Sequence, residues 1–404
     1  MSEVKKPRVL IVIERFYPLV GGAEVQCLQI GGRLKMKGYR IEIVTKRWRK
    51  EFSQKEILEG GLPINRVGFL GFNRMADYLS GLALFVFLLK NRNNFDLLFI
   101  DSGIANIFAS TAIIVGKILG KRIVAKFETP GELTFSGDEA LSSKKFVHPL
   151  IRFRLSVAKK ADYYLAQTEG MRNELVDFGI ENQKIKSFPN SIDENIFCPP
   201  ASEKDKEELK KQLNLPDDKK LVFFCGRLVK RKGLIFLLNL WVIFSKKNSS
   251  AVLVLIGSGK NQPDSVEEEL LKIAENPSLK DKIIFLGEKN REEVADYLKT
   301  ADVFVYPSIH PEGRAVSVLE AMSTEVPVVV TDIGGLREIV TDGFSGYLVE
   351  VDDTKTFSFL LEKLIKNQKL RASLGKEGRR EVIKNYSLEK SAEDINNYFC
   401  LICK

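Results

Sequence analysis

The sequence predicts an α/β protein made of two doubly wound domains, each with a parallel sheet covered by helices. Strand and helix signals alternate along the whole chain, which is the order that gives parallel strands. A proline-rich segment near residue 190 interrupts the alternation once, and the pattern then restarts. The length of 404 residues leaves about 200 for each half, enough for each to bury a core of its own.

The first half begins with a β-branched strand and a helix joined by a glycine loop. Residues 8–13 are typical of a buried strand, and a loop through Pro18 leads to Gly21 and Gly22. Gly38 is placed to end the following helix in a left-handed conformation. Apolar residues at spacings of 4, 3 and 4 predict that this helix buries Ala23, Cys27, Ile30 and Leu34. Further strands are expected at residues 41–45, 96–100, 122–127 and 163–166, and further helices at residues 104–119 and 169–178.

A linker separates the two halves. Residues 188–200 contain three prolines, and a charged run follows to Lys211, a composition typical of a linker. We therefore predict domains over residues 1–190 and 191–385, with a C-terminal helix over residues 386–404 that crosses back to the first domain. Ligands bind beyond the carboxyl ends of parallel strands, so a cleft between the domains is the expected site. In the second half we expect strands at residues 221–225, 251–256, 283–286, 303–306 and 328–331, and helices at residues 233–244 and 291–299.

Composition and charge exclude several classes of protein. Apolar residues make up 44% and charged residues 28% of the chain, which excludes wholesale disorder. The five cysteines show no disulfide or zinc spacing, which favours a reducing compartment. The longest apolar stretch, residues 78–89, is shorter than the roughly 20 residues of a membrane span. We expect a cytoplasmic protein, with peripheral contact to the inner face of the cell membrane as an open alternative.

The glycine loop of the first half is a weak signal for anion binding. Gly21 and Gly22, followed by Ala23 and Glu24, open a helix, where backbone N–H groups can approach an anion closely. The pattern is not the GxGxxG fingerprint, and Thr45 rather than an acidic residue ends the next strand, so a dinucleotide site is not expected. A plain tight turn is the alternative.

Two segments of the second half contain more candidate binding residues than this loop does. Gly226–Gly233 follows a strand and carries four cations, including Arg227 and Lys232, which suits a phosphate but also fits a solvated basic loop. In the second segment Glu312 and Glu320 are eight residues apart, and a helix is expected to begin near Ala315. The free N–H groups of its first turn suit a diphosphate, and Glu320 suits ribose hydroxyls. A capping carboxylate and a surface carboxylate are the alternatives.

With these motifs in place, the chain resembles the retaining glycosyltransferases of family 4, which have the GT-B fold of two facing Rossmann-like domains. The similarity covers nearly the whole chain in order. The matching pieces are residues 21–24, Pro189-Asn190 with Asp193 and Phe197, residues 226–233, Glu312-x7-Glu320-Ala-Met, residues 327–330, Gly334-Gly335-Leu-Arg-Glu338 and residues 342–349.

The resemblance implies a role for each matched residue. Arg227 and Lys232 would hold the donor diphosphate, Glu312 would lie near the donor sugar and Glu320 would bind the ribose. The loop of Gly21 and Gly22 would close over the donor from the other domain. The residues that follow Glu312, namely Gly313, Arg314, Ala315 and Val316, would meet the phosphates through their backbone. Transfer would proceed with retention and without a metal or other cofactor, because these cations and the helix N-terminus neutralise the leaving diphosphate.

Several positions depart from the family pattern. No histidine follows the strand at residues 122–127, where Glu128 could contact the donor sugar or belong to a structural turn. Arg314 and Ala315 replace an aromatic residue and a glycine, so Arg314 adds a cation beside the phosphates. Glu325 replaces a glycine, and a left-handed conformation there would cost about 1 kcal/mol or more. His310, two residues before Glu312, could touch the sugar or be an ordinary loop residue, and Glu24 is a candidate contact on the acceptor or sugar side.

The implied partners are a nucleoside-diphosphate sugar and a glycan or lipid-linked acceptor of cell-envelope synthesis. Residues 1–190 carry 30 Lys and Arg against 19 Asp and Glu, an excess that suits an anionic membrane, although solubility also explains it. A nucleic-acid binder would not need the glutamates and glycines described above. A GT-B sugar-nucleotide epimerase and a catalytically silent, membrane-binding homologue remain the alternatives. The basic cluster of the first half consists of Lys35, Lys37, Arg40, Lys46, Arg47, Arg49 and Lys50, with Trp48 among them.

Overall fold

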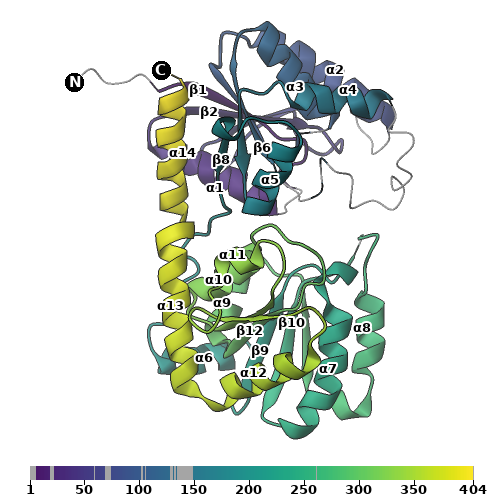
Figure 1. Cartoon of the computed structure of the whole chain (residues 1–404), viewed down its shortest axis with the longest axis vertical. Coiled ribbons are helices and arrows are strands. Elements are labelled where there is room, and N and C mark those ends of the chain that lie inside the picture. Colours follow the sequence, from purple (N-terminus) through teal and green to yellow (C-terminus); the bar gives the residue numbers. More distant parts are fainter. Residues whose placement is uncertain are drawn as a thin grey trace, which may run out of the picture. The chain divides into compact units, whose positions relative to one another are not determined.

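The chain forms two compact units, Met1–Pro189 with Leu388–Lys404 (unit 1) and Asn190–Ser387 (unit 2). Figure 1 shows the computed structural model, in which both units are α/β. It describes residues 6–18, 22–58, 60–68, 74–101, 103–104, 106–127, 131, 133, 149–260 and 262–403.

Unit 1 is built on an eight-stranded sheet in the order β3-β4-β2-β1-β5-β6-β7-β8. Every neighbouring pair is parallel except β3 and β4. The strand order reverses beside β1, and in sheets of this kind ligands bind beyond the carboxyl ends of the strands at such a reversal. The strands are β1 (Arg8–Val12), β2 (Arg40–Lys46), β3 (Lys55–Ile57), β4 (Pro63–Val67), β5 (Leu97–Ile100), β6 (Arg122–Phe127), β7 (Tyr163–Ala166) and β8 (Ile185–Ser187).

Helices bury apolar residues on both faces of this sheet. As predicted, α1 buries Cys27, Ile30 and Leu34, whereas Ala23 of the same face is half-buried. Gly38 beyond the end of the helix has φ +89°. The C-terminal helix α14 packs on α1, and its Phe399 ring meets Phe99 of β5 edge to face at 5.9 Å. The helices of unit 1 are α1 (Gly22–Met36), α2 (Arg74–Lys90), α3 (Ile107–Ile118), α4 (Pro149–Ala158), α5 (Glu169–Asp177) and α14 (Leu388–Ile402).

Unit 2 contains a six-stranded, wholly parallel sheet in the order β11-β10-β9-β12-β13-β14. Its order reverses between β9 and β12, so the loops after these two strands flank the expected ligand crevice. The strands are β9 (Lys220–Cys225), β10 (Ala251–Ile256), β11 (Ile283–Gly287), β12 (Val303–Tyr306), β13 (Val328–Thr331) and β14 (Tyr347–Val349). The helices are α6 (Glu203–Gln212), α7 (Leu234–Lys247), α8 (Glu267–Ala274), α9 (Arg291–Thr300), α10 (Val316–Ser323), α11 (Leu336–Ile339), α12 (Thr354–Lys366) and α13 (Gln368–Tyr386).

The charged run after residue 200 is a helix, so its interpretation as linker was wrong. Ser202 caps α6 by accepting a hydrogen bond from Asp205 N at 3.2 Å. Lys206 and Lys210, which a linker would leave in solvent, lie 3.4 and 3.8 Å from the carboxylate of Asp302. A buried acidic partner far along the chain therefore holds a helix that lacks an apolar face.

Four short strands, β3, β4, β8 and β14, were not predicted. Polar residues interrupt β3, β4 and β8, and β14 has only three residues, so none of them shows a continuous apolar run long enough to indicate a strand. The left-handed conformation considered for Glu325 is present, with φ +59°. A Cβ on Gly375 of α13 would lie 1.9 Å from the carbonyl oxygen of Glu325, so the two backbones are in close contact.

Candidate functional site

Two loops meet at the carboxyl edge of the unit 2 sheet. The basic loop (residues 226–233) follows β9, and the glutamate loop (residues 307–315) follows β12 and leads into α10. Because β9 and β12 are parallel neighbours, both loops leave the sheet at the same edge. The strand order thus brings together motifs that are some 80 residues apart in the sequence.

Close backbone contact joins these loops. Gly233 has φ +69°, and a Cβ there would lie 1.9 Å from the carbonyl oxygen of Pro307, so only glycine fits. The carbonyl of Arg231 accepts hydrogen bonds from Ile309 N and Ser308 Oγ, both at 3.0 Å. The two loops therefore hold each other in a fixed relative position.

An ion pair at the centre links Lys232 of the basic loop to Glu312 of the glutamate loop. Their Nζ and Oε1 atoms are 2.8 Å apart, and Ser308 Oγ donates to the same oxygen at 2.9 Å. Lys232 also donates to the hydroxyl of Tyr306 at the end of β12. Burial lowers the pKa of Lys232, although Glu312 opposes the shift. The ammonium group is thus a buried cation with one carboxylate partner, suited to an additional anion.

Glu320 lies one turn into α10, half-buried. Burial raises the pKa of its carboxyl group to about 7, and Arg291, at the start of α9, opposes the shift only in part. The N-cap residue of α10 is Ala315. No side chain among the described residues caps the first turn of this helix. Val316, the first residue of α10, therefore presents its N–H group beside the glutamate loop.

The remaining predicted residues of unit 2 have different surroundings. Arg227 is exposed, and its Nη1 lies 3.3 Å from Gln262 Oε1. In the glutamate loop His310 is exposed and Gly313 is half-buried. The guanidinium group of Arg314 pairs with Glu338 Oε2 at 2.7 Å. Arg314 was expected to bring its charge to the phosphates; in this structure its guanidinium group is engaged by the Glu338 carboxylate.

The loop after β10 was missed by the sequence interpretation. Gly257 has φ +131°, and a Cβ there would lie 2.0 Å from the carbonyl oxygen of Gly226. Leu228 N of the basic loop donates to Ser258 O at 3.1 Å. The pair of glycines in Gly257-Ser258-Gly259 after a β-branched strand was the available signal.

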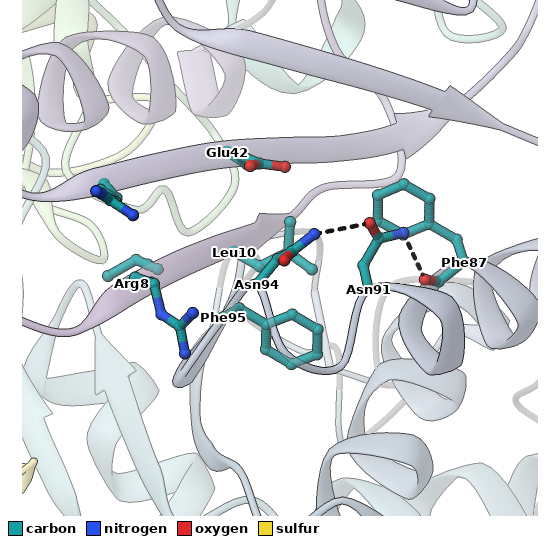
Figure 2. Close-up of a pocket in the computed structure, with 9 residues that line it drawn as sticks. Arg8, Leu10, Glu42, Phe87, Asn91, Asn94 and Phe95 are labelled. Atoms are coloured by element: carbon teal, nitrogen blue, oxygen red, sulfur yellow. Dashed lines mark hydrogen bonds between the residues drawn. The ribbon is translucent and has the colours of Figure 1, made fainter.

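In unit 1, Gly22 begins α1 and Glu24 is in its first turn. Gly21 and Glu128 lie outside the described residues. A small pocket of about 120 Å³ in this unit is at the opposite edge of its sheet, beside the first residues of β1 and β2. Figure 2 shows Asn94 directed at Asn91, whose own amide reaches the carbonyl of Phe87. The pocket is lined by unit 1 residues, and the Asn94 and Asn91 amides each donate one hydrogen bond within its wall.

The basic cluster of unit 1 is largely paired within the unit. Lys46 is buried, 2.5 Å from Asp77, and stacks over Trp48. Lys35 donates to Gly61 O, Lys37 pairs with Glu389, and Arg47 donates to Phe52 O. Arg40, Arg49 and Lys50 are exposed. The seven cations therefore do not form a single open patch.

Among the described residues, no group of three or more His, Cys, Asp or Glu side chains is placed to hold a metal ion. None of the helices in these parts of the chain is long and apolar enough to cross a membrane.

Two family models match the chain. The model described as "Glycosyl transferases group 1" matches residues 205–381, and the model described as "Glycosyltransferase Family 4" matches residues 20–196. The first includes both loops of unit 2, and the second includes α1 with its glycine loop.

Curated relatives and solved structures show the same similarity. N-acetyl-alpha-D-glucosaminyl L-malate synthase of Bacillus anthracis is 26% identical over 93% of this chain and 92% of that protein. The UDP-Gal:alpha-D-GlcNAc-diphosphoundecaprenol alpha-1,3-galactosyltransferase of Escherichia coli is 27% identical over 54% of this chain and 55% of that protein. The crystal structure of Anabaena HepE in complex with UDP-glucose has a TM-score of 0.76 and 18% identity, over 97% of this chain and 99% of that chain.

Proposed function

We propose a donor, a mechanism and a setting from one premise: the chain belongs to the group 1 glycosyltransferases of family 4 and is a sugar-transferring enzyme with the GT-B fold. The donor is a nucleoside-diphosphate hexose and the acceptor is a hydroxyl of a glycan or lipid-linked glycan of the cell envelope. The observation that carries the proposal is the buried pair of Lys232 and Glu312 beside the uncapped first turn of α10.

The donor diphosphate binds where the positive groups converge. Lys232 Nζ and the guanidinium group of Arg227 supply two cations, and Val316 N–H supplies the dipole of a helix N-terminus. These groups are in place before the reaction and stabilise the charge that develops on the leaving diphosphate. No divalent metal is required in this scheme, because the chain's own cations neutralise the leaving group.

The two glutamates bind opposite ends of the donor. Glu320 accepts hydrogen bonds from the ribose hydroxyls, and Glu312, oriented by Ser308, accepts from a hydroxyl of the sugar. The acceptor hydroxyl attacks the anomeric carbon on the face from which the diphosphate leaves, and a diphosphate oxygen takes its proton. One C–O bond breaks and another forms, with retained anomeric configuration. Proton NMR of the product tests this step, and an inverted anomeric centre would contradict it.

Nucleotide binding is the first experiment. UDP, GDP and ADP are added at 100 times their dissociation constants, where a ligand stabilises the folded chain by about 2.7 kcal/mol. We expect one nucleotide to raise the melting temperature, equally with and without EDTA. Arg227→Ala should remove the shift, and Lys376→Ala, an exposed cation on α13, should keep it. No shift with any nucleotide would contradict the donor site, and loss of the shift in EDTA would contradict the metal-independent scheme.

Membrane contact through unit 1 fits a lipid-linked acceptor. One face of α2 exposes Met75, Tyr78, Leu82 and Val86, at spacings of 3, 4 and 4; Met75 is 67% and Leu82 59% exposed. The neighbouring α4 exposes Arg152 and Phe153, and both helices pack on α3 (Figure 1). Apolar side chains beside cations are suited to the interface of an anionic bilayer.

Vesicle sedimentation tests this contact. Vesicles of phosphatidylglycerol and phosphatidylcholine should bind the wild type, and Leu82→Glu should weaken binding at least tenfold while nucleotide binding is unchanged. Glu268→Gln, an exposed change on α8 of unit 2, is the control. Equal sedimentation of wild type and Leu82→Glu would contradict a role for α2.

A further inference from the structure

The chain passes between its two units twice, after Pro189 and after Ser387. Inside unit 2 these two crossings are bonded to each other. Ile192 N donates to Tyr386 O at 2.9 Å, and Ile192 forms a parallel bridge with Ser387. The first and last residues of unit 2 therefore form one short, strand-like connection.

Arg314 of the glutamate loop touches both of these crossings. Its carbonyl oxygen accepts a hydrogen bond from Asn190 Nδ2 at 3.0 Å, and its guanidinium carbon lies 5.5 Å from the ring centre of Tyr386. A cation over an aromatic face at this distance is an attractive contact. Arg314 thus contacts the first crossing, after Pro189, through its backbone and the second crossing, after Ser387, through its side chain.

Glu338 of α11 completes the connection. Its carboxylate lies 2.7 Å from Arg314 Nη2, and its carbonyl oxygen accepts from the Tyr386 hydroxyl at 2.9 Å. The side chains of Arg314 and Glu338 are only 11% and 22% exposed, so solvent screens the pair weakly. Gly335 N also donates to Glu312 O at 2.8 Å, which fixes the start of α11 to the same loop.

The side chain at position 314 determines whether this connection can form. A planar guanidinium group can pair with a carboxylate and stack on a ring at the same time, which a lysine ammonium group cannot do with equal geometry. A shorter or uncharged side chain would remove the contacts that the loop makes with the Glu338 carboxylate and the Tyr386 ring. The contact is therefore a specific property of arginine at this position.

We propose that Arg314 is a positioning residue that couples the occupancy of the glutamate loop to the two chain crossings between the units. The proposal rests on the proposed donor site, since the ligand is the nucleotide diphosphate on the backbone of residues 313–316. Nucleotide binding there restricts the motion of the loop backbone. Through its contacts, Arg314 then restricts the motion of Asn190 and Tyr386. Coupling between sites is reciprocal, so ordered crossings also favour the nucleotide-binding form of the loop.

Hydrogen–deuterium exchange of the full chain, with and without saturating UDP, GDP or ADP, tests the coupling. In the wild type, the nucleotide should slow exchange of the amides at residues 190–192 and 385–388 by about fivefold or more. In Arg314→Ala, the nucleotide should still bind, within about fivefold of the wild-type affinity, but the slowing at residues 385–388 should disappear. The slowing at residues 190–192 should weaken without disappearing, because the backbone carbonyl at position 314 still accepts from Asn190. The fold decrease in kcat should exceed the fold increase in KM, because the variant loses the ordering of the crossings but keeps nucleotide binding.

Three variants distinguish coupling from a general structural defect. Arg314→Lys should restore part of the protection through its ion pair with Glu338. Tyr386→Phe keeps the ring and should retain most of the protection. Arg337→Ala removes a neighbouring arginine that pairs with Asp332 and is 58% exposed, so it should behave as the wild type.

Each contrary result has a distinct meaning. Loss of nucleotide binding in Arg314→Ala would make Arg314 a direct ligand and overturn the coupling. Unchanged protection in Arg314→Ala, or no protection at the crossings of a nucleotide-bound wild type, would also overturn it. A wild-type chain that binds none of UDP, GDP and ADP would contradict the proposed function itself, and the coupling with it.

Discussion

The amino and carboxyl edges of the unit 2 sheet each hold a carboxylate withdrawn from solvent, in opposite surroundings. Asp302, just before β12, accepts from Leu221 N at 3.0 Å and has four cationic side chains within 3.8 Å. Burial would raise its pKa, but Lys206, Lys210 and the other donors lower it. Glu320, at the carboxyl edge, has its pKa raised to about 7 by burial, opposed only by Arg291.

This difference indicates that the Asp302 carboxylate stabilises the fold, whereas the Glu320 carboxylate is suited to binding a ligand. The cations around Asp302 also donate to backbone carbonyls, such as Lys206 to Ala301 O and Arg371 to Leu364 O. Asp302 therefore ties α6, β9 and α13 to the start of β12. Glu320 keeps its acceptor capacity, which a pair of ribose hydroxyls can satisfy.

Removing the Asp302 charge should have the largest effect on stability. Asp302→Ala leaves several buried cations without their anion, and we expect a loss of about 3–5 kcal/mol in the free energy of unfolding. Urea unfolding followed by the fluorescence of Trp241, which lies in unit 2, measures it. Asp296→Ala, whose partner Lys299 is at the surface, should cost less than about 1 kcal/mol. Similar losses in both variants would show that the cluster does not hold the fold.

Lys232 carries the strongest expected effect on catalysis. Lys232→Met should lower kcat/KM by about 10²–10³-fold, or roughly 3–4 kcal/mol, because it removes a buried cation from the leaving diphosphate. Steady-state kinetics with the identified donor provides the measurement. Lys230→Met, an exposed cation of the same loop, is the matched control and should change kcat/KM by less than about threefold. Equal losses of kcat/KM in both variants would indicate that the general electrostatic field of the basic loop, and not one positioned charge, stabilises the leaving diphosphate.

The sequence predicts one edge of this sheet better than the other. The residues of the carboxyl edge are contiguous in motifs, such as residues 226–233, so their type and spacing indicate phosphate chemistry. The partners of Asp302 are spread over 165 positions, from Lys206 to Arg371, and only tertiary packing brings them together. Such a cluster leaves no periodic or local signal.

Arg314 shows that the partner of a side chain is hard to predict from local sequence even within a motif. Its position beside Glu312 predicted a cation near the phosphates, but its carboxylate partner lies 24 residues further on, in α11. Strands such as β9 and β10 were predicted almost to the residue, because buried parallel strands are continuous apolar runs. Side-chain direction depends on neighbours that the local sequence does not contain.

The raised pKa of Glu320 predicts a pH-dependent stability. Its carboxyl group titrates near 4.5 when unfolded and near 7 when folded, so ionisation is unfavourable in the folded chain. The contribution of Glu320 to stability is most favourable below pH 4.5 and decreases as the pH rises to about 7. Glu320→Gln should remove this decrease, a difference of about 1–3 kcal/mol between pH 5 and pH 8 after allowance for partial exposure.

Thermal unfolding at the two pH values measures the effect. The difference between Glu320→Gln and the wild type should grow in favour of the variant from pH 5 to pH 8. Glu268→Gln, an exposed change on α8, should show no such trend. A constant difference between Glu320→Gln and the wild type would mean that Glu320 is already paired as a carboxylate, like Asp302.

The smallest effect is expected at Glu325, which lies beside Asp302 in a polar pocket at the amino edge. Its φ of +59° suits glycine, and a side chain with a Cβ costs about 1 kcal/mol in this conformation. Glu325→Gly should therefore raise the free energy of unfolding by roughly that amount, without changing kcat/KM. Asp352→Gly, at φ +63°, is the matched control and should gain less, because aspartate tolerates the left-handed region better. Destabilisation by Glu325→Gly would show that the glutamate side chain stabilises the pocket around Asp302 by more than its backbone conformation costs, so the amino edge would depend on that carboxylate as well.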